Sequence, residues 1–146
     1  MSRKYFSKYV VELVKEDDCK YEAKIDTAYD AYRKILEVFR LDKKAEEYCV
    51  MFCLDSRNNA IGAFLISKGT LNLTSINVTD IIKRAILCNS RRIIIAHNHP
   101  SGSIEPSKHD IDATKKINEA CNLMGIDFLD HLIIGDREYQ SIISRK

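Results

Sequence analysis

Hydrophobic residues recur along the first half of the chain with two different spacings, which predict a helix followed by two strands. From Thr27 to about Leu41 they return every three or four residues, a spacing typical of an amphipathic helix. Residues 48–54 are instead continuously apolar, and residues 60–67 resume this character after a polar turn. These two runs predict a β-hairpin. A shorter apolar stretch at residues 8–14 indicates an additional first strand.

The second half of the chain alternates between helical and strand-like patterns. Thr79 and Asp80 can cap a helix that runs to about residue 88. A buried strand follows at residues 92–96, and a second helix extends from Ser107 to about Met124, where a glycine ends it. Two closing strands are expected at residues 127–134 and 138–143. The resulting order, βαββαβαββ, predicts one mixed α/β domain over residues 1–146, with helices packed on a sheet.

The composition is that of an ordinary globular domain. The 146 residues fit one domain, and 45% hydrophobic with 30% charged residues is usual for a soluble protein. No stretch approaches the roughly 18 apolar residues of a membrane span, and the first residues lack a secretory signal. We therefore expect a cytoplasmic protein without a membrane partner. The 23 basic and 21 acidic residues are spread along the chain, which predicts no concentrated field to attract DNA.

Three side chains that can bind a metal follow the strand at residues 92–96 at short intervals. His97 and His99 lie two residues apart, so on a strand both imidazoles point to the same face and can bind one ion. A turn at residues 100–102 then leads to Asp110, in the first turn of the next helix. Two imidazoles and one carboxylate leave a fourth tetrahedral position free, which is typical of hydrolytic rather than structural zinc sites. The sequence therefore predicts a zinc ion bound by these three residues.

This motif resembles the signature of the JAMM (MPN+) metallohydrolases. A His-x-His-Pro string begins at His97, and the serine and aspartate that follow at the spacing of the signature are Ser107 and Asp110. Two longer strings, HNHPSG at residues 97–102 and DHLIIG at residues 130–135, are similar to the bacterial RadC-type JAB domain. Four residue types at fixed spacing rarely occur together by chance, so this resemblance is specific.

The resemblance covers about residues 46–144 and implies a fold. It implies a zinc-dependent protein with a cytidine-deaminase-like core, a single mixed sheet in a three-layer α/β domain. Deaminase chemistry is not implied, because the H-x-E and P-C-x-x-C elements of zinc deaminases are missing. Longer RadC-type proteins also carry an N-terminal helix-hairpin-helix region, which we do not expect because the first 46 residues contain no glycine. The Pro-Arg-Glu tripeptide usual in relatives is replaced here by Val-Thr-Asp at residues 78–80, which leaves the role of that arginine unassigned.

The resemblance also implies roles for individual side chains. The JAMM pattern has an upstream glutamate at the start of a strand, here Glu46 or Glu47, and the surrounding strand pattern favours Glu47. Glu47 would move the protons of a metal-activated water, and Ser107 would donate to the oxyanion of the intermediate. Ser107 and Asp110 also have the spacing of a helix cap. His131 is either packed in its strand or a hydrogen-bonding partner of the site, and we favour packing.

The predicted activity is zinc-dependent hydrolysis of an amide bond, peptide or isopeptide, in a protein or peptide. The alternative is a DNA-repair-associated or non-enzymatic interaction module with a bound metal. The complete ligand set argues against the inactive module, and the balanced charge argues against DNA binding. A metal-dependent nuclease is disfavoured because an arginine-poor site with one metal offers little to bind a phosphate. Edge strands near the C-terminus offer a surface for a second copy, as a homodimer, or for an extended substrate.

Overall fold

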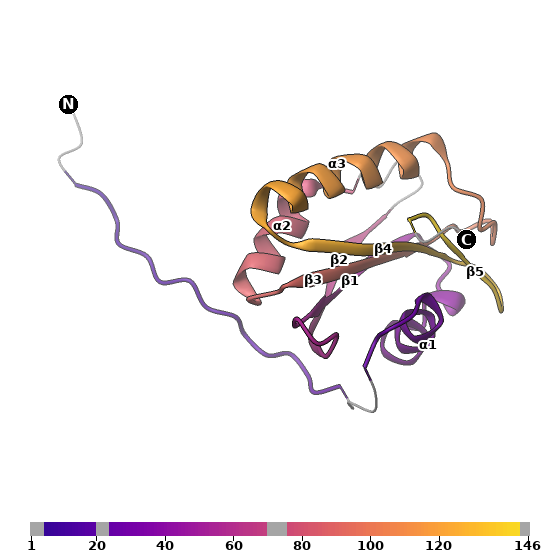
Figure 1. Ribbon diagram of the computed structural model, residues 1–146, viewed down its shortest axis with the longest axis horizontal. Helices are drawn as coiled ribbons and strands as arrows, with labels where there is room; N and C mark the ends of the chain where they lie inside the picture. The colour runs from indigo at the N-terminus through magenta and orange to yellow at the C-terminus, as the bar shows by residue number, and fades with distance from the viewer. Residues whose placement is uncertain (1–4, 20–23, 70–75, 144–146) are drawn as a thin grey trace.

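The computed structural model describes residues 5–19, 24–69 and 76–143, and its helices and strands form a layered α/β domain. In chain order the elements are α1 (Ala28–Phe39), the 3-10 helix η1 (Leu41–Lys43), β1 (Tyr48–Leu54), β2 (Ala60–Lys68), α2 (Val78–Leu87), β3 (Arg92–Asn98), α3 (Lys108–Met124), β4 (Asp127–Ile134) and β5 (Tyr139–Ser141). The strands make one sheet in the order β2-β1-β3-β4-β5. Figure 1 shows α2 and α3 on one face of this sheet and α1 on the other. No helix in the described ranges is long and apolar enough to cross a bilayer.

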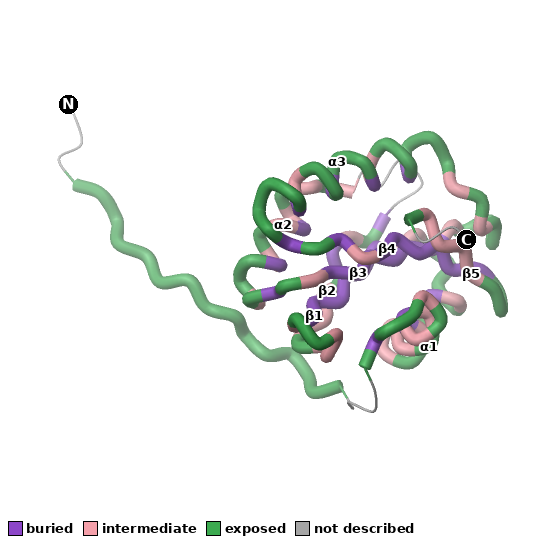
Figure 2. The backbone as a smooth tube through the Cα atoms, viewed as in Figure 1, coloured by how far each residue is buried: buried purple, intermediate pink, exposed green. Residues whose placement is uncertain are grey.

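The central strands are continuously apolar because both of their faces are covered. β1 runs antiparallel to β2 and β3, whereas β3 and β4 are parallel. Ile93 and Ile95 on β3 contribute to the core beneath α2 and α3, while Ile94 and Ala96 contribute to the core beneath α1. Alternation of side chains along a strand therefore places His97 on the face of Ile93 and Ile95, toward α3. The layered architecture explains the burial of the sheet in Figure 2.

The mixed α/β sheet predicted from the sequence is confirmed, with corrections at its two ends. The strand predicted at residues 8–14 is wrong: residues 5–19 contain no helix or strand, and their backbone is drawn as an exposed tube in Figure 2. A short apolar run specifies a strand only where a neighbouring strand supplies hydrogen bonds. The last strand is shorter than predicted, because the backbone N–H of Ile143 bonds to the Asp130 carboxylate instead of continuing the ladder.

Side-chain caps set the start of each α-helix. α1 begins with a capping box between Thr27 and Asp30, as its pattern leads one to expect. The cap of α2 differs from the prediction of Thr79 and Asp80. Asn77 occupies this position, and its side-chain oxygen accepts a hydrogen bond of 2.9 Å from the Thr79 N–H. The helix therefore begins earlier than predicted, because asparagine is at least as good a cap as threonine or aspartate.

Gly135, which follows β4, allows close packing against the loop that carries the His-x-His motif. A methyl group added at Gly135 would lie 2.6 Å from Ile104 Cγ2 and 3.1 Å from the carbonyl oxygen of Gly102. We expect Gly135→Ala to lower the free energy of unfolding by about 1–3 kcal/mol through overpacking, measured by urea denaturation. The double variant Gly135→Ala/Ile104→Ala should lose less stability than the sum of its single changes. Strictly additive losses would contradict this contact as the cause.

Candidate metal centre

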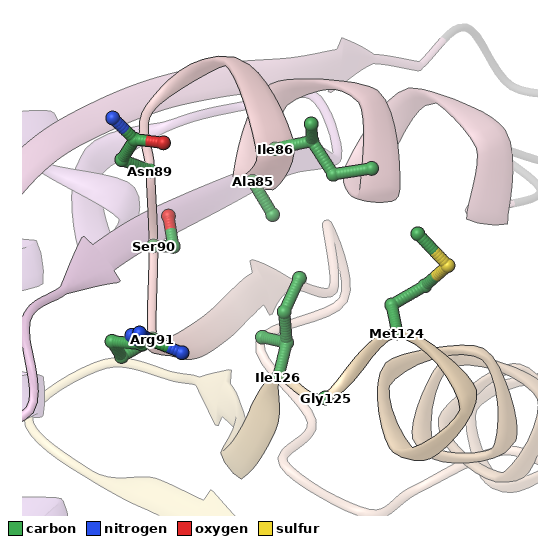
Figure 3. A pocket seen from close by; sticks show the side chains of 8 residues that line it. All are labelled: Ala85, Ile86, Asn89, Ser90, Arg91, Met124, Gly125 and Ile126. Carbon is green, nitrogen blue, oxygen red and sulfur yellow. The ribbon is translucent and has the colours of Figure 1, made fainter.

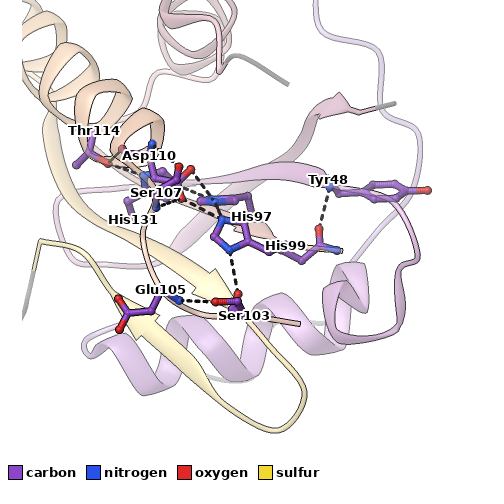
Figure 4. Close-up of polar contacts among 10 residues, drawn as sticks. Tyr48, His97, His99, Ser103, Glu105, Ser107, Asp110, Thr114 and His131 are labelled. Carbon is purple, nitrogen blue, oxygen red and sulfur yellow. Dashed lines mark hydrogen bonds and ion pairs between the residues drawn. The ribbon is translucent and has the colours of Figure 1, made fainter. Parts of the chain in front are cut away.

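Three side chains converge where β3 ends and α3 begins. The Nε2 atoms of His97 and His99 lie 3.0 Å apart. The two oxygens of the Asp110 carboxylate reach one ring each, at 3.1 Å from His97 Nε2 and 3.0 Å from His99 Nε2. Figure 4 shows both rings directed toward this carboxylate. The structure thus brings together the three residues proposed as ligands from the sequence.

A capping box holds Asp110 in place at the start of α3. The Asp110 N–H donates to Ser107 Oγ at 3.1 Å, and the Ser107 N–H donates to Asp110 Oδ2 at 2.8 Å. These reciprocal bonds satisfy backbone donors that the first helical turn cannot pair internally. The same carboxylate therefore caps the N-terminus of the helix and contacts both histidines. The Ser107 hydroxyl still has its hydrogen to donate, because its oxygen is the acceptor in the cap.

The other nitrogen of each ring has a partner that assigns its proton. Thr114 Oγ1 donates to the Asp110 carbonyl oxygen at 2.7 Å, because a carbonyl can only accept. Thr114 Oγ1 then accepts from His131 Nδ1 at 2.7 Å, which leaves His131 Nε2 as an acceptor for His97 Nδ1, also at 2.7 Å. His99 Nδ1 donates to the carbonyl oxygen of Ser103 at 2.9 Å. When they are neutral, His97 and His99 therefore both direct an Nε2 lone pair at Asp110, and a ring that gains a proton at Nε2 donates it to that carboxylate.

This arrangement suits a small divalent cation. When both rings are neutral, two imidazole lone pairs and a carboxylate meet with no hydrogen between them. In a tetrahedral site with bonds of about 2.0–2.1 Å, the ligand atoms stand about 3.3 Å apart. The two Nε2 atoms, 3.0 Å apart, need to separate by only a few tenths of an ångström to reach that spacing, and a different oxygen of the Asp110 carboxylate lies 3.0–3.1 Å from each of them.

Charge interactions within the cluster shift its titration. Burial alone would raise the pKa of Asp110, but hydrogen bonds from His97 and His99 hold it well below its ordinary value. The hydrogen bond to Asp110 raises the pKa of His99 in spite of burial. Burial lowers the pKa of His131 well below its usual range, so this ring is neutral, in agreement with its assigned protons. A proton shared between His99 and Asp110 occupies the place that a cation would take, so metal binding competes with protonation.

The candidate general base lies beside these rings. A carboxylate oxygen of Glu47 and ring nitrogens of His97 and His99 all lie within 4.8 Å of one another, a grouping that can itself hold a metal ion. Glu46, the neighbouring alternative, is exposed. Asn98 positions Glu47, because its side chain accepts from the Tyr48 N–H at 2.8 Å and donates to the Glu46 carbonyl oxygen at 2.9 Å. These bonds tie the start of β1 to the end of β3.

Sequence reasoning missed part of the support of the site. His131, for which we favour packing from the sequence, is fully buried but also hydrogen-bonds to His97. Thr114 was not singled out, although it lies four residues after Asp110 and hence on the same face of α3. That spacing is the one signal in the sequence that points to Thr114. His109 lies next to Asp110 and is exposed, as expected for a side chain about 100° further around the helix.

Thr114 provides a test of the proton assignment. Thr114→Val keeps the shape of the side chain but removes the hydroxyl, so His131 Nδ1 loses its partner and His97 is no longer held in one tautomer. We expect the affinity for zinc to fall by about 10–100-fold, measured by competition with a chromophoric chelator. Thr114→Ser retains the hydroxyl and should bind zinc like the unmodified protein. Equal affinities for the valine and serine variants would contradict the assignment.

Comparison with known proteins places the chain beside a family described as the RadC-like JAB domain, whose model matches residues 25–146. A UPF0758 protein of Staphylococcus haemolyticus is 45% identical over 98 residues, which are 67% of this chain and 43% of that protein. A UPF0758 protein of Actinobacillus pleuropneumoniae serotype 5b is 41% identical over 111 residues, 74% of this chain and 50% of that protein. A UPF0758 protein of Methanosarcina mazei is 38% identical over 119 residues, which are 82% of this chain and 51% of that protein. The chain therefore spans about half the length of these curated relatives.

Proposed function

The chain belongs to the RadC-like JAB domain family, and on this premise we propose that it is a zinc-dependent hydrolase of amide bonds. Its substrate would be a peptide or isopeptide bond in a protein or peptide. The convergence of His97 Nε2, His99 Nε2 and the Asp110 carboxylate carries the proposal. A donor set of two imidazoles and one carboxylate favours zinc and leaves a position for water or substrate. When bound, zinc supplies Lewis acidity and makes water a nucleophile at neutral pH.

Glu47 is the proposed general base. Its carboxylate is half-buried beside His97 and His99, so that a water molecule bound between these groups would be within its reach. It takes a proton from the attacking water and then delivers that proton to the nitrogen of the leaving amine. One carboxylate can perform both transfers because the leaving amine departs from the same carbon that the water attacks.

Ser107 is the proposed donor to the oxyanion. Its oxygen already accepts the Asp110 N–H, and this bond fixes the side chain at the start of α3. The hydroxyl hydrogen is then free to donate to the negative oxygen that develops on the scissile carbonyl. His131 and Ser103 do not react in this scheme; they hold the ligand rings in one orientation.

The experiment is a cleavage assay with zinc-loaded protein. The substrates are a panel of peptides and of isopeptides linked through lysine Nζ, and the products are identified by mass spectrometry. We expect cleavage that disappears after chelation and returns with zinc. Failure of fully zinc-loaded protein to cleave any of these substrates would contradict the proposed hydrolase activity. In that case, affinity for duplex DNA that falls steeply with salt would support the DNA-associated alternative instead.

A further inference from the structure

Two cysteine thiols meet beneath the C-terminal end of α2, at the end of the sheet opposite the metal centre. Cys53 lies on β1 beside Ile93, at the start of β3, whereas His97 lies near the end of that strand. Cys53 is fully buried, and Cys88, the C-cap of α2, is partly exposed. Both pack in the core beneath α2 and α3, and their thiols interact with one another. The two residues therefore form a dithiol pair with one member inside the core and the other at its surface.

Gly62 on the neighbouring strand β2 makes room for this pair. Gly62 is the register partner of Cys53, and a methyl group built at Gly62 would lie 4.0 Å from Cys53 Cβ and only 2.6 Å from Cys88 Sγ. The Cβ atoms of two cysteines joined by a disulfide stand about 3.5–4.5 Å apart. The methyl position at Gly62 thus has the spacing of a disulfide partner of Cys53, and the Cys88 sulfur lies next to it. Because Gly62 has no side chain, Cys88 can approach Cys53 from across the strand pair.

Ser90 adds a polar group to the dithiol pair. Figure 3 shows it on the segment that joins α2 to β3, beside an open hollow of about 420 Å³. Ser90 is only 8% exposed, and its hydroxyl lies against the Cys53 thiol with no stronger partner among the described residues. A buried hydroxyl without a strong partner is unusual, and redox chemistry is one of its explanations. The hydroxyl can donate to the Cys53 sulfur, and this bond strengthens when the sulfur becomes negative.

The surroundings of the two thiols give them different roles in an oxidation. Burial raises the pKa of Cys53 to about 12 although the Ser90 hydroxyl lowers it, so Cys53 stays protonated at neutral pH. Cys88 is partly exposed, so a small oxidant can reach its side chain. The thiolate is the form that reacts, and access controls which cysteine is oxidised. Cys88 is therefore the thiol that reacts first, and Cys53 is the neighbour that can close a disulfide.

We propose that Cys53 and Cys88 form a reversible disulfide when the protein meets hydrogen peroxide. The Cys88 thiolate attacks one peroxide oxygen, the O–O bond breaks, and the departing hydroxide takes up the proton that Cys88 released. This step leaves a sulfenic acid on Cys88 and one water molecule. The Cys53 sulfur then attacks the Cys88 sulfur as the S–O bond breaks, and the departing hydroxide takes the Cys53 proton as a second water molecule. Two thiols are oxidised to one disulfide, and the peroxide is reduced to water.

Ser90 would assist the second step, because its hydroxyl can stabilise the negative charge on the Cys53 sulfur as the proton leaves. The disulfide would join the C-terminal end of α2 to β1 and close the loop between residues 53 and 88. The proposal is independent of the proposed hydrolase activity, since neither cysteine contacts the metal centre.

The test treats the whole chain with hydrogen peroxide and maps its disulfides by mass spectrometry of peptides prepared without reductant. We expect a cross-link between Cys53 and Cys88 within one chain, which dithiothreitol reverses. The oxidised protein should also melt at a higher temperature than the reduced protein, because the cross-link restricts the unfolded chain. Cys53→Ser and Cys88→Ser should each lose the cross-link and this rise in melting temperature.

Gly62→Ala tests the geometry while both cysteines are retained. The added methyl group would displace the Cys88 sulfur from its place beside Cys53, so the cross-link should be lost. The matched control is Cys49→Ser, which changes another buried cysteine of β1 in the same core cluster and should keep the cross-link. Circular dichroism verifies that each variant is folded, and the partly exposed Cys88→Ser provides the test should Gly62→Ala not fold.

Three outcomes would overturn the proposal. The first is oxidation of Cys88 to a sulfinic acid with no cross-link to Cys53, which would show that the second thiol does not reach it. The second is a cross-link from Cys88 to Cys49 or Cys121 in place of Cys53. The third is a cross-link that forms in Gly62→Ala as readily as in the unmodified protein, which would show that the sulfurs do not meet beside Gly62.

Discussion

Replacing His99 with alanine is expected to abolish stoichiometric zinc binding while leaving the domain folded. His99 contributes one of the three inner atoms of the centre, and its side chain is 16% exposed, so its removal opens the site without a large cavity in the core. The affinity should fall by more than the roughly 10–100-fold typical of losing an outer hydrogen-bonding partner. The measurement is zinc per chain by elemental analysis. Thermal unfolding with and without zinc provides a second readout, because a ligand that binds only the folded state raises its stability.

The matched control for this variant is His109→Ala. His109 is also a histidine of the same segment but is exposed beside Asp110, so its loss should leave the zinc content at about one ion per chain. Retention of one zinc ion by His99→Ala, with the zinc-dependent rise in melting temperature intact, would exclude His99 as a ligand. A change of similar size in both variants would indicate binding to surface histidines rather than to the centre.

Glu47→Gln is expected to remove activity while the metal stays bound. The amide preserves the size of the side chain but cannot accept the proton of the attacking water. Loss of a general base typically lowers kcat by about 10²–10⁴-fold. The zinc content should stay unchanged, because His97, His99 and Asp110 keep their contacts. The cleavage assay and the elemental analysis are performed on the same preparation, so that a lost metal is not mistaken for lost catalysis.

Glu46→Gln is the control that separates the two neighbouring glutamates. Glu46 is exposed, so this change should preserve kcat. The reverse pattern, with activity lost in Glu46→Gln and kept in Glu47→Gln, would contradict the assigned base. Loss of zinc in Glu47→Gln would show that Glu47 is a ligand, as its grouping with His97 and His99 also allows.

The features that the sequence predicts well are those set by neighbouring residues. The hairpin of β1 and β2 follows from two apolar runs and the polar turn between them, and the observed bounds differ from the prediction by one residue. The meeting of His97 with His99 follows from the two-residue period of a strand. Asp110 is placed by the local cap with Ser107. In each case a few adjacent residues contain the whole signal.

The features that the sequence does not predict depend on contacts between distant segments. Thr114 and His131 contact one another only because α3 packs on β4, and no local pattern reports which hydroxyl meets which ring. The apolar run at residues 8–14 resembles a strand locally, but whether a strand forms depends on a partner elsewhere in the chain. Periodicity identifies an element, and the packing of elements decides which polar groups face each other.

The double use of Asp110 has a consequence for how the proposed ion would enter and leave the site. One carboxylate oxygen, Oδ2, accepts the Ser107 N–H and also contacts His99. Fraying of the first turn of α3 would therefore withdraw the proposed ligand Asp110, and a bound ion would in turn oppose fraying. Release of the ion would then be coupled to local unfolding of the helix N-terminus, so that the two events form one cooperative equilibrium.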